Sequence, residues 1–182
     1  MHFGDDRHGR VIARATDALT DMVDSLKDCS LYFGLAGVAV ALRALGHGAA
    51  ADRALGRIWE RFDGERWNDM FELFVGNAGI GLGALHAGEV DLAVTAVTPY
   101  LTTADPMPWG VNWAVRPLPP RSHHIAHGTL GIVYALAAVG DAAGQDDLVD
   151  MALTGAAEWS DATRRVRTAS SSRTPTRRTD PN

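Results

Sequence analysis

The chain has one cysteine among its 182 residues and no long apolar run. A single thiol, Cys29, excludes an internal disulfide, and this fits the reducing environment of the cytoplasm. No uninterrupted apolar stretch approaches the roughly 18 residues that cross a bilayer. The first residues, Met-His-Phe-Gly-Asp-Asp, are acidic and lack the apolar centre of a secretory signal. We therefore expect a cytoplasmic protein that does not enter a membrane.

Basic residues are scarce outside the C-terminal end. Residues 162–182 hold six arginines and one aspartate, whereas the preceding 161 positions carry 11 basic and 21 acidic residues. An acidic body does not favour nucleic acid or anionic lipid, so we expect neither as a partner. We accordingly divide the chain into a domain over residues 1–161 and a basic tail over residues 162–182.

The basic tail permits two interpretations. The helical pattern stops after Trp159, and the chain continues in arginine, serine, threonine and proline. Such a segment is either a disordered tail that contacts nucleic acid or lipid, or the out-of-frame translation of a GC-rich gene. We favour the second interpretation, in which the tail is disordered and has no function of its own.

What the chain does contain is one glycine phrase in three copies. The copies are Gly34-Leu-Ala-Gly37, Gly76-Asn-Ala-Gly79 and Gly128-Thr-Leu-Gly131, and they are spaced 42 and 52 residues apart. Each opens an apolar stretch that ends in a further glycine twelve positions after the first, at Gly46, Gly88 and Gly140. Repetition near these periods is typical of proteins built from stacked structural units.

The segments after each phrase alternate between two helical patterns, and no stretch shows convincing strand alternation. The segments after Gly34, over 77–87 and over 126–139 are apolar on every side, which predicts buried helices. The segments over 49–62, 89–101 and 145–159 are amphipathic, and so is an earlier one over 11–26. A buried helix followed by a surface helix, three times over, predicts an all-α fold of helical hairpins. Either an α/α toroid, closed or partly closed, or an α-solenoid satisfies this pattern.

The glycines need a physical reason, because glycine costs about 1 kcal/mol relative to alanine inside a helix. The interpretation we prefer is tight backbone packing at the corners of the hairpins. The alternative is functional: several helix N-termini converge on one end of the fold and create a region favourable to anions.

A long segment between Thr102 and Ile125 separates the second hairpin from the third. It contains five prolines together with Trp109 and Trp113, and we expect it to lack secondary structure of its own. Loops of this length are often functional. Trp67, Trp109 and Trp113 either line a pocket or pack in the core.

Histidine gathers directly before the third glycine phrase, in the run His123-His124-Ile-Ala-His127. His127 precedes a predicted helix whose dipole disfavours a positive imidazolium, so a neutral ring there suits general acid–base chemistry. Two other interpretations stay open: a structural histidine, or a metal ligand together with His123. Glu72 lies four residues before Gly76 among apolar neighbours, and it is either a capping residue or a buried acid facing the mouth of the fold. Cys29 is expected to be a buried structural thiol.

The glycine phrases with their flanks resemble the lanthionine synthetase C-like family. The resemblance covers roughly residues 25–160 and is carried by three segments, Ser30-Leu-Tyr-Phe-Gly-Leu-Ala-Gly-Val, Glu72-Leu-Phe-Val-Gly-Asn-Ala-Gly-Ile and Ala126-His-Gly-Thr-Leu-Gly-Ile-Val-Tyr-Ala-Leu. It implies an α/α toroid of seven helical hairpins around zinc, of which this chain holds about three as an open arc. It also implies thioether cyclisation, in which a cysteine thiol adds to a dehydrated serine or threonine of a precursor peptide.

The resemblance also implies roles for individual residues. His127 falls on the family's active-site histidine, which protonates the enolate formed by thiol attack. Glu72 falls where the cyclases carry an aspartate. The family's zinc ligands stand in a Cys-Gly and a Cys-His-Gly phrase, neither of which occurs here, and Cys29 comes too early to replace them. We therefore expect no zinc or other cofactor in this chain and no metal-ligating residues.

Three functions follow as hypotheses. The first is an N-terminal fragment of a lanthipeptide cyclase, inactive or nearly so, whose partner is a precursor peptide. The alternative is a non-catalytic helical-repeat module that binds a peptide. A glycan hydrolase that uses Glu72 as its acid is disfavoured, because such enzymes need a second carboxylate and none is placed convincingly. The inner helices left uncovered by missing hairpins also predict self-association.

Overall fold

The computed structural model describes residues 8–114 and 121–171, and the chain within them is mainly helical. The elements are α1 (Gly9–Met22), α2 (Leu35–Ala44), α3 (Gly48–Trp59), α4 (Asn77–His86), α5 (Val90–Val97), the 3₁₀ helix η1 (Thr98–Leu101), β1 (Asp105–Met107), β2 (Gly110–Asn112), α6 (Thr129–Ala143) and α7 (Asp146–Ser171). The predicted all-α class is confirmed. No helix in these ranges is both long and apolar enough to cross a membrane. Three predictions fall at least partly outside the described residues: those on the first seven residues, on Pro117–Pro120 and on the last eleven residues.

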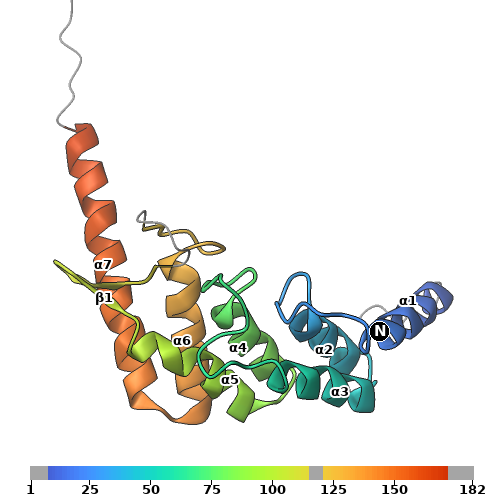
Figure 1. The fold of residues 1–182 in the computed structure, drawn as a ribbon. Coiled ribbons are helices and arrows are strands. Elements are labelled where there is room, and N and C mark those ends of the chain that lie inside the picture. The colour runs from blue at the N-terminus through green and yellow to red at the C-terminus, as the bar shows by residue number, and fades with distance from the viewer. Residues whose placement is uncertain (1–7, 115–120, 172–182) are drawn as a thin grey trace, which may run out of the picture.

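Three helical hairpins lie side by side in a curved row, as Figure 1 shows. They are α2 with α3, α4 with α5, and α6 with α7. The inner helix α4 lies between α2 and α6, and eight of its ten residues are buried. The prediction of a buried inner helix is therefore confirmed for the middle hairpin.

The end of the row is less covered. The inner helix α6 packs against α4, α5 and α7, but its Tyr134 is exposed. At the other end, α1 leaves Val11, Ile12 and Met22 exposed, so its predicted apolar face is only partly used. The central inner helix, α4, is thus packed on every side, because a neighbouring hairpin lies on each side of it.

A left-handed glycine ends each inner helix. Gly46 and Gly88 have φ of +82° and +87°, and the chain closes the helix ends with the two hydrogen bonds of a Schellman motif. The third helix differs from the expectation, because it continues through Gly140 and closes at Gly144, with φ +64°. An added Cβ at Gly140 would lie 2.9 Å from Val149 Cγ2 and 3.0 Å from Leu148 Cβ, so this glycine allows α7 to approach α6 closely.

A close backbone approach begins each inner helix. At the first glycine of each phrase, Gly34, Gly76 and Gly128, an added Cβ would meet the carbonyl oxygen of the residue six positions earlier well within 3.0 Å. The second glycines, Gly37, Gly79 and Gly131, meet the carbonyl six positions earlier in the same way. In each copy the preceding loop folds back over the first helical turn. The tight-packing interpretation of the glycines is confirmed.

The second glycine also joins neighbouring repeats. An added Cβ at Gly79 would lie 3.1 Å from Leu31 Cβ of the preceding repeat, and one at Gly131 would lie 2.7 Å from Leu73 Cβ. The same leucine position therefore packs onto the same glycine position of the next hairpin. This recurring contact sets each hairpin beside the one before it.

The segment before α6 is not free of secondary structure, contrary to the expectation. β1 and β2 form an antiparallel hairpin, in which Asp105 pairs with Asn112. The hairpin lies against α7, where an added Cβ at Gly110 would overlap the Thr154 carbonyl oxygen. Strands of three residues are too short to show an alternation of apolar and polar residues in the sequence. The strands are stabilised by packing against α7.

The helix α7 extends further than the sequence pattern indicated. Its backbone is helical from Asp146 to Ser171, so the prediction that the helix stops after Trp159 is wrong, and the boundary at 161/162 lies inside α7. Adding residues to an existing helix is far easier than starting one, and arginine and alanine are good helix formers.

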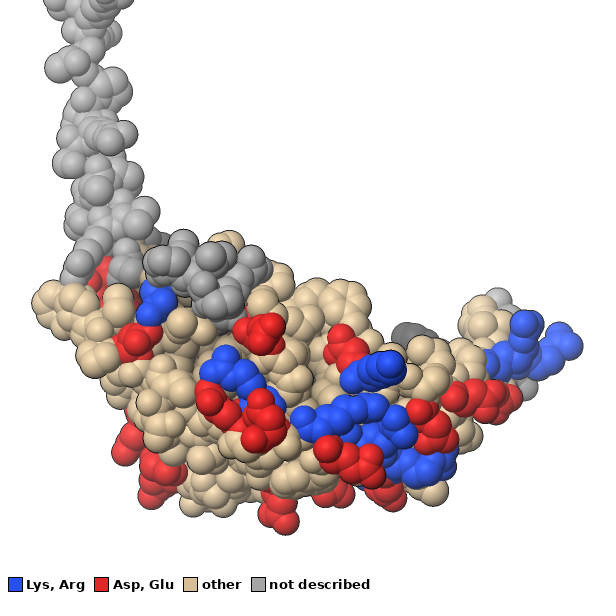
Figure 2. All heavy atoms as spheres, viewed as in Figure 1, with Lys and Arg blue, Asp and Glu red and all other residues tan. Residues whose placement is uncertain are grey.

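Acidic residues lie at the start of two of the three outer helices, α5 and α7, but not of α3. Asp91 lies in the first turn of α5, and Asp146 and Asp147 lie in the first turn of α7, where the helix dipole favours negative charge. Figure 2 shows acidic side chains along the lower edge of the molecule, opposite the loops that precede the inner helices.

Replacing Gly79 by alanine tests the close approach. We expect Gly79→Ala to lower the free energy of unfolding by about 3 kcal/mol, because its Cβ has no room against the Leu73 carbonyl and the Leu31 side chain. The matched control is Gly56→Ala in α3, where no atom lies within 4 Å of an added Cβ. This variant should gain about 1 kcal/mol from helix propensity. Urea unfolding measures both, and equal effects would contradict the packing argument.

Candidate functional site

The loops that precede α2, α4 and α6 lie along one edge of the hairpin row, the upper edge in Figure 1. They carry the candidate residues of the sequence, Glu72 before α4 and His127 before α6. Because each loop is held over its helix by the same glycine contacts, equivalent positions of the three loops recur along this edge. We call the edge formed by these three loops the mouth.

Glu72 is fully buried, with 0% of its surface exposed. Its Oε1 accepts a hydrogen bond from the Val75 amide at 2.9 Å, and its Oε2 accepts one from the Phe74 amide at 2.8 Å. The folded-back loop directs these amides onto the side chain, so the buried carboxylate has polar partners. Glu72 is thus a buried acid at the mouth, as one interpretation had it. It also caps its own loop rather than a helix.

His127 lies against this carboxylate. Its Nδ1 is 3.0 Å from Glu72 Oε2, and its side chain is 45% exposed. A carboxylate accepts hydrogen bonds, so we assign the proton of the neutral ring to Nδ1. This leaves Nε2 free to accept a proton, or to donate one once the ring is charged. The structure therefore brings Glu72 and His127, 55 positions apart, into one acid–base pair.

A buried polar network supports the loop that carries His127. Thr129, at the start of α6, donates its amide to the Ser122 carbonyl at 2.9 Å. Its hydroxyl lies 2.6 Å from Asn112 Oδ1, which also accepts the Trp113 amide at 2.7 Å. This network ties the β-hairpin to the first turn of α6. The sequence did not predict this supporting role of Asn112 and Thr129, because nothing in the residues next to them indicates it.

Tyr100 plays the corresponding part beside Glu72. Its hydroxyl accepts the Ala78 amide at 2.9 Å and donates to the Phe71 carbonyl at 3.1 Å. It is fully buried, and burial raises the pKa of Tyr100 well above its usual value. The Ala78 hydrogen bond lowers that pKa, and the nearby charge of Glu72 raises it further. Tyr100 thus holds the Glu72 loop onto α4.

The same contacts bear on the anion hypothesis. The Ala78 amide is bound by Tyr100, while the Leu35 and Thr129 amides donate to loop carbonyls at 2.9 Å each. These first-turn donors are therefore used within the protein and do not present a shared site for an anion.

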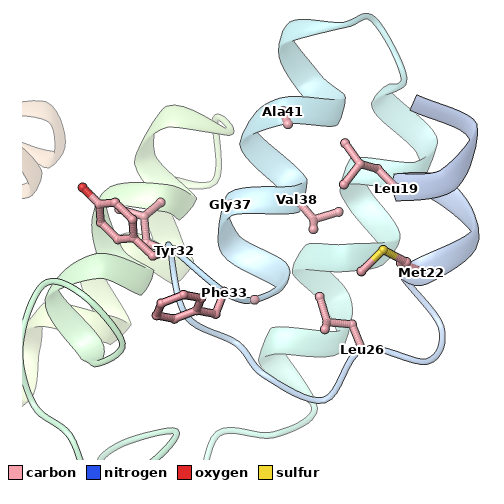
Figure 3. A pocket seen from close by; sticks show the side chains of 10 residues that line it. Leu19, Met22, Leu26, Tyr32, Phe33, Gly37, Val38 and Ala41 are labelled. Carbon is pink, nitrogen blue, oxygen red and sulfur yellow. The ribbon is translucent and has the colours of Figure 1, made fainter. Parts of the chain in front are cut away.

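An aromatic row leads from His127 to the first hairpin. The Phe74 and His127 rings have centroids 5.1 Å apart, and Phe74 stacks on Tyr32 at 4.1 Å. Phe33 meets the edge of Phe74 at 5.4 Å. Tyr32 and Phe33 are 57% and 63% exposed. Both also line an open hollow of about 310 Å³ between α1 and α2, and Figure 3 shows Tyr32 on the side away from Leu19.

The remaining candidates lie apart from the pair. Cys29 is buried as expected, and burial raises the pKa of its thiol, although Arg61 acts in the opposite direction. Trp113 is a core residue that donates to the Tyr100 carbonyl. Trp67 lines a hollow of about 520 Å³ beside Cys29, and Trp109 is exposed.

No metal site is formed in the part of the chain that the structure describes. There, no three or more His, Cys, Asp or Glu side chains come together in a way that could hold a metal ion. The proposed pairing of His123 with His127 has no third ligand in these residues. The donor set therefore does not fit a resident zinc.

Comparison with protein families gives a match over most of the chain. A model described as lanthionine synthetase C-like protein matches residues 2–161. Comparison with curated proteins and with solved structures gives no match. The matched range includes all three glycine phrases and the residues of the acid–base pair.

Replacing Glu72 by glutamine tests the buried acid. The NH₂ group of the glutamine side chain would face the backbone N–H of Phe74 or Val75, and that N–H would lose its hydrogen-bond acceptor. We expect Glu72→Gln to lower the free energy of unfolding by about 1–3 kcal/mol. Glu60→Gln, at an exposed position after α3, should change it by less than about 0.5 kcal/mol. Urea unfolding at neutral pH compares them, and an unchanged Glu72→Gln variant would show that the carboxylate is not needed.

Replacing Tyr100 by phenylalanine tests the second support and its pH dependence. We expect Tyr100→Phe to lose about 1–3 kcal/mol at neutral pH, since two buried groups lose their partner. The folded chain resists ionising Tyr100, so the stabilisation by the hydroxyl is present below the unfolded pKa of about 10 and falls as pH rises above it.

The difference in unfolding free energy between wild type and Tyr100→Phe should therefore shrink above pH ~10. The matched control is Tyr134→Phe, at an exposed tyrosine of α6, which should show no such trend. A difference that stays constant with pH would contradict the raised pKa.

Proposed function

This chain belongs to the lanthionine synthetase C-like family, and on that premise we propose that its mouth carries the proton-transfer part of a peptide cyclase site. His127 is the proton donor and Glu72 orients it. The observation that carries the proposal is the 3.0 Å contact between His127 Nδ1 and a fully buried carboxylate, with the imidazole itself half exposed. A fixed ring with one free nitrogen at an accessible surface is the arrangement that general acid–base catalysis requires.

The reaction that this pair suits is the addition of a thiolate to a dehydrated serine or threonine in a peptide. The sulfur forms a bond to the β-carbon, and the electron pair of the carbon–carbon double bond moves into an enolate. The enolate takes a proton at its α-carbon from Nε2 of the charged His127 ring. The thiol proton passes to solvent and the neutral His127 ring takes a proton back from solvent, so the product has the combined composition of the thiol and the peptide.

Glu72 has two tasks in this proposal. Its carboxylate accepts the Nδ1 proton, which directs Nε2 outwards, and its negative charge stabilises the charged ring before proton transfer. The Phe74 and Val75 amides hold the carboxylate in place, so it does not have to reorganise during the reaction. Both Glu72 oxygens are engaged inside the protein, which argues against Glu72 as the acid of a glycan hydrolase.

Activation of the thiol is not part of the proposal. The described residues do not fit zinc, and we assign no step to it. The chain is therefore proposed to deliver a proton to an enolate, whichever group prepares the thiolate.

The test supplies the thiolate from solution. The substrate is a synthetic peptide with one dehydroalanine, and 2-mercaptoethanol in neutral buffer is the thiol. We expect the full chain to speed up the addition and to favour one configuration at the new α-carbon, because His127 delivers its proton from one face. His127→Asn should lower the protein-dependent rate by about 10²-fold and return the ratio of diastereomers to that of the reaction without protein.

His86→Asn is the matched control, since His86 is an exposed histidine at the end of α4. It should leave both the rate and the ratio unchanged. If His127→Asn behaves like His86→Asn, His127 does not transfer the proton.

A second function is a peptide-binding module without turnover. The observation that favours it is the group of exposed apolar side chains beside the pair, Tyr32, Phe33 and Ile125. Fluorescence anisotropy of the labelled dehydroalanine peptide separates the two functions. Binding that is the same in wild type and His127→Asn, with no accelerated addition in either, supports the module and contradicts the cyclase site.

A further inference from the structure

Phe74 contacts the acid–base pair through its backbone and through its side chain. Its amide donates to Glu72 Oε2, the oxygen that also binds His127 Nδ1, at 2.8 Å. The same amide lies 3.2 Å from the carbonyl oxygen of Ala126, the residue next to His127. Its ring lies 5.1 Å from the imidazole with 49° between the planes. One residue thus touches both members of the pair and the backbone that carries one of them.

The Phe74 ring is itself restrained from the first hairpin. Tyr32 stacks on it with 4.1 Å between centroids and 9° between planes, and Phe33 meets its edge at 5.4 Å. Tyr32 and Phe74 occupy the same position in their repeats, two residues before the first glycine, and Ala126 holds that position in the third. The third repeat therefore adds no further aromatic ring at this position, and the row ends at His127.

The hydrogen bond to Glu72 leaves one freedom of the imidazole unrestrained. It sets the distance of Nδ1 from the carboxylate, but the ring can still turn about this contact because nearly half of its surface faces solvent. Turning would change the direction of Nε2, the atom that exchanges the proton. A ring packed against the imidazole limits this motion, since two aromatic rings in contact prefer particular relative orientations.

We infer that Phe74 is a positioning residue for His127, with its ring held by Tyr32 of the first hairpin. The inference rests on the proposed function in that His127 is the group to be positioned. The inference means that Phe74, from the second hairpin, positions a residue of the third. Tyr32, from the first hairpin, contributes by stacking on Phe74. Phe74 acts through His127 and is not itself a catalytic residue.

The experiment follows the imidazole directly by NMR of the full chain with isotope-labelled histidine. The His127 signals are identified by their loss in His127→Asn. In wild type we expect the neutral ring to carry its proton on Nδ1, and its carbon-bound protons to show the ring-current shift of the adjacent Phe74. Phe74→Leu keeps the backbone amide and removes the ring. It should abolish the ring-current shift and increase the share of the other tautomer several-fold.

Two further variants separate positioning from simple packing. Phe74→Tyr retains the ring and should restore the wild-type signals. Phe62→Leu removes another stacked aromatic, one that packs on Trp67 at 4.5 Å, and should leave the His127 signals unchanged even if stability falls. His127 signals that are unchanged in Phe74→Leu, or changed equally in Phe62→Leu, would overturn the inference.

Tyr32→Leu covers the case in which Phe74→Leu does not fold, because Tyr32 is mostly exposed. It should move the His127 ring-current shift in the same direction as Phe74→Leu, by a smaller amount, since the Phe74 ring loses its stacking partner. An unchanged shift would overturn the part played by the first hairpin. None of these readouts requires turnover, so a failed addition assay with the expected NMR changes counts against the proposed function alone.

Discussion

The absence of a side chain at two positions of each repeat is the constraint on which the rest of the structure depends. At both glycines a carbonyl oxygen of the preceding loop lies well within 3.0 Å of the place that a Cβ would take, in all three hairpins. None of these glycines needs a positive φ, so close approach rather than backbone freedom explains their presence. The loop is thereby held against the first turn of the inner helix, and its side chains reach the mouth in a defined order.

The buried carboxylate is a consequence of this loop shape. Removing a charge from water is costly unless donors replace the lost hydration. The folded-back loop supplies the Phe74 and Val75 amides, and the neighbouring hairpin supplies His127. Tyr100 keeps the loop in place by bridging Phe71 and Ala78. The energetic cost of burying Glu72 is therefore offset by groups from two hairpins and from η1.

The three loops have equivalent backbones but present different side chains at the same position. The position before the first glycine is Phe33 in the first repeat, Val75 in the second and His127 in the third. The backbone is equivalent, but only the third side chain can exchange a proton. The position two residues before the glycine supplies Tyr32 and Phe74, which form the row beside that histidine. In the proposed function, the chemistry thus comes from individual residues placed on a repeated support.

The amino-acid sequence by itself determined the helical class, the repeat and the family, and it favoured tight packing as the reason for the glycines. These depend on patterns within a few turns of helix, where apolar spacing and residue size act locally. It also singled out Glu72 and His127 as candidates, but it left open whether they meet.

Tertiary structure alone decided that these two residues, 55 positions apart, share a hydrogen bond. It also decided that Tyr100, Asn112 and Phe74 support them, that α6 closes at Gly144, and that the chain before α6 forms a β-hairpin on α7. The reason is physical. Local patterns specify which face of a helix is buried, whereas contacts between distant loops depend on how whole hairpins pack against one another.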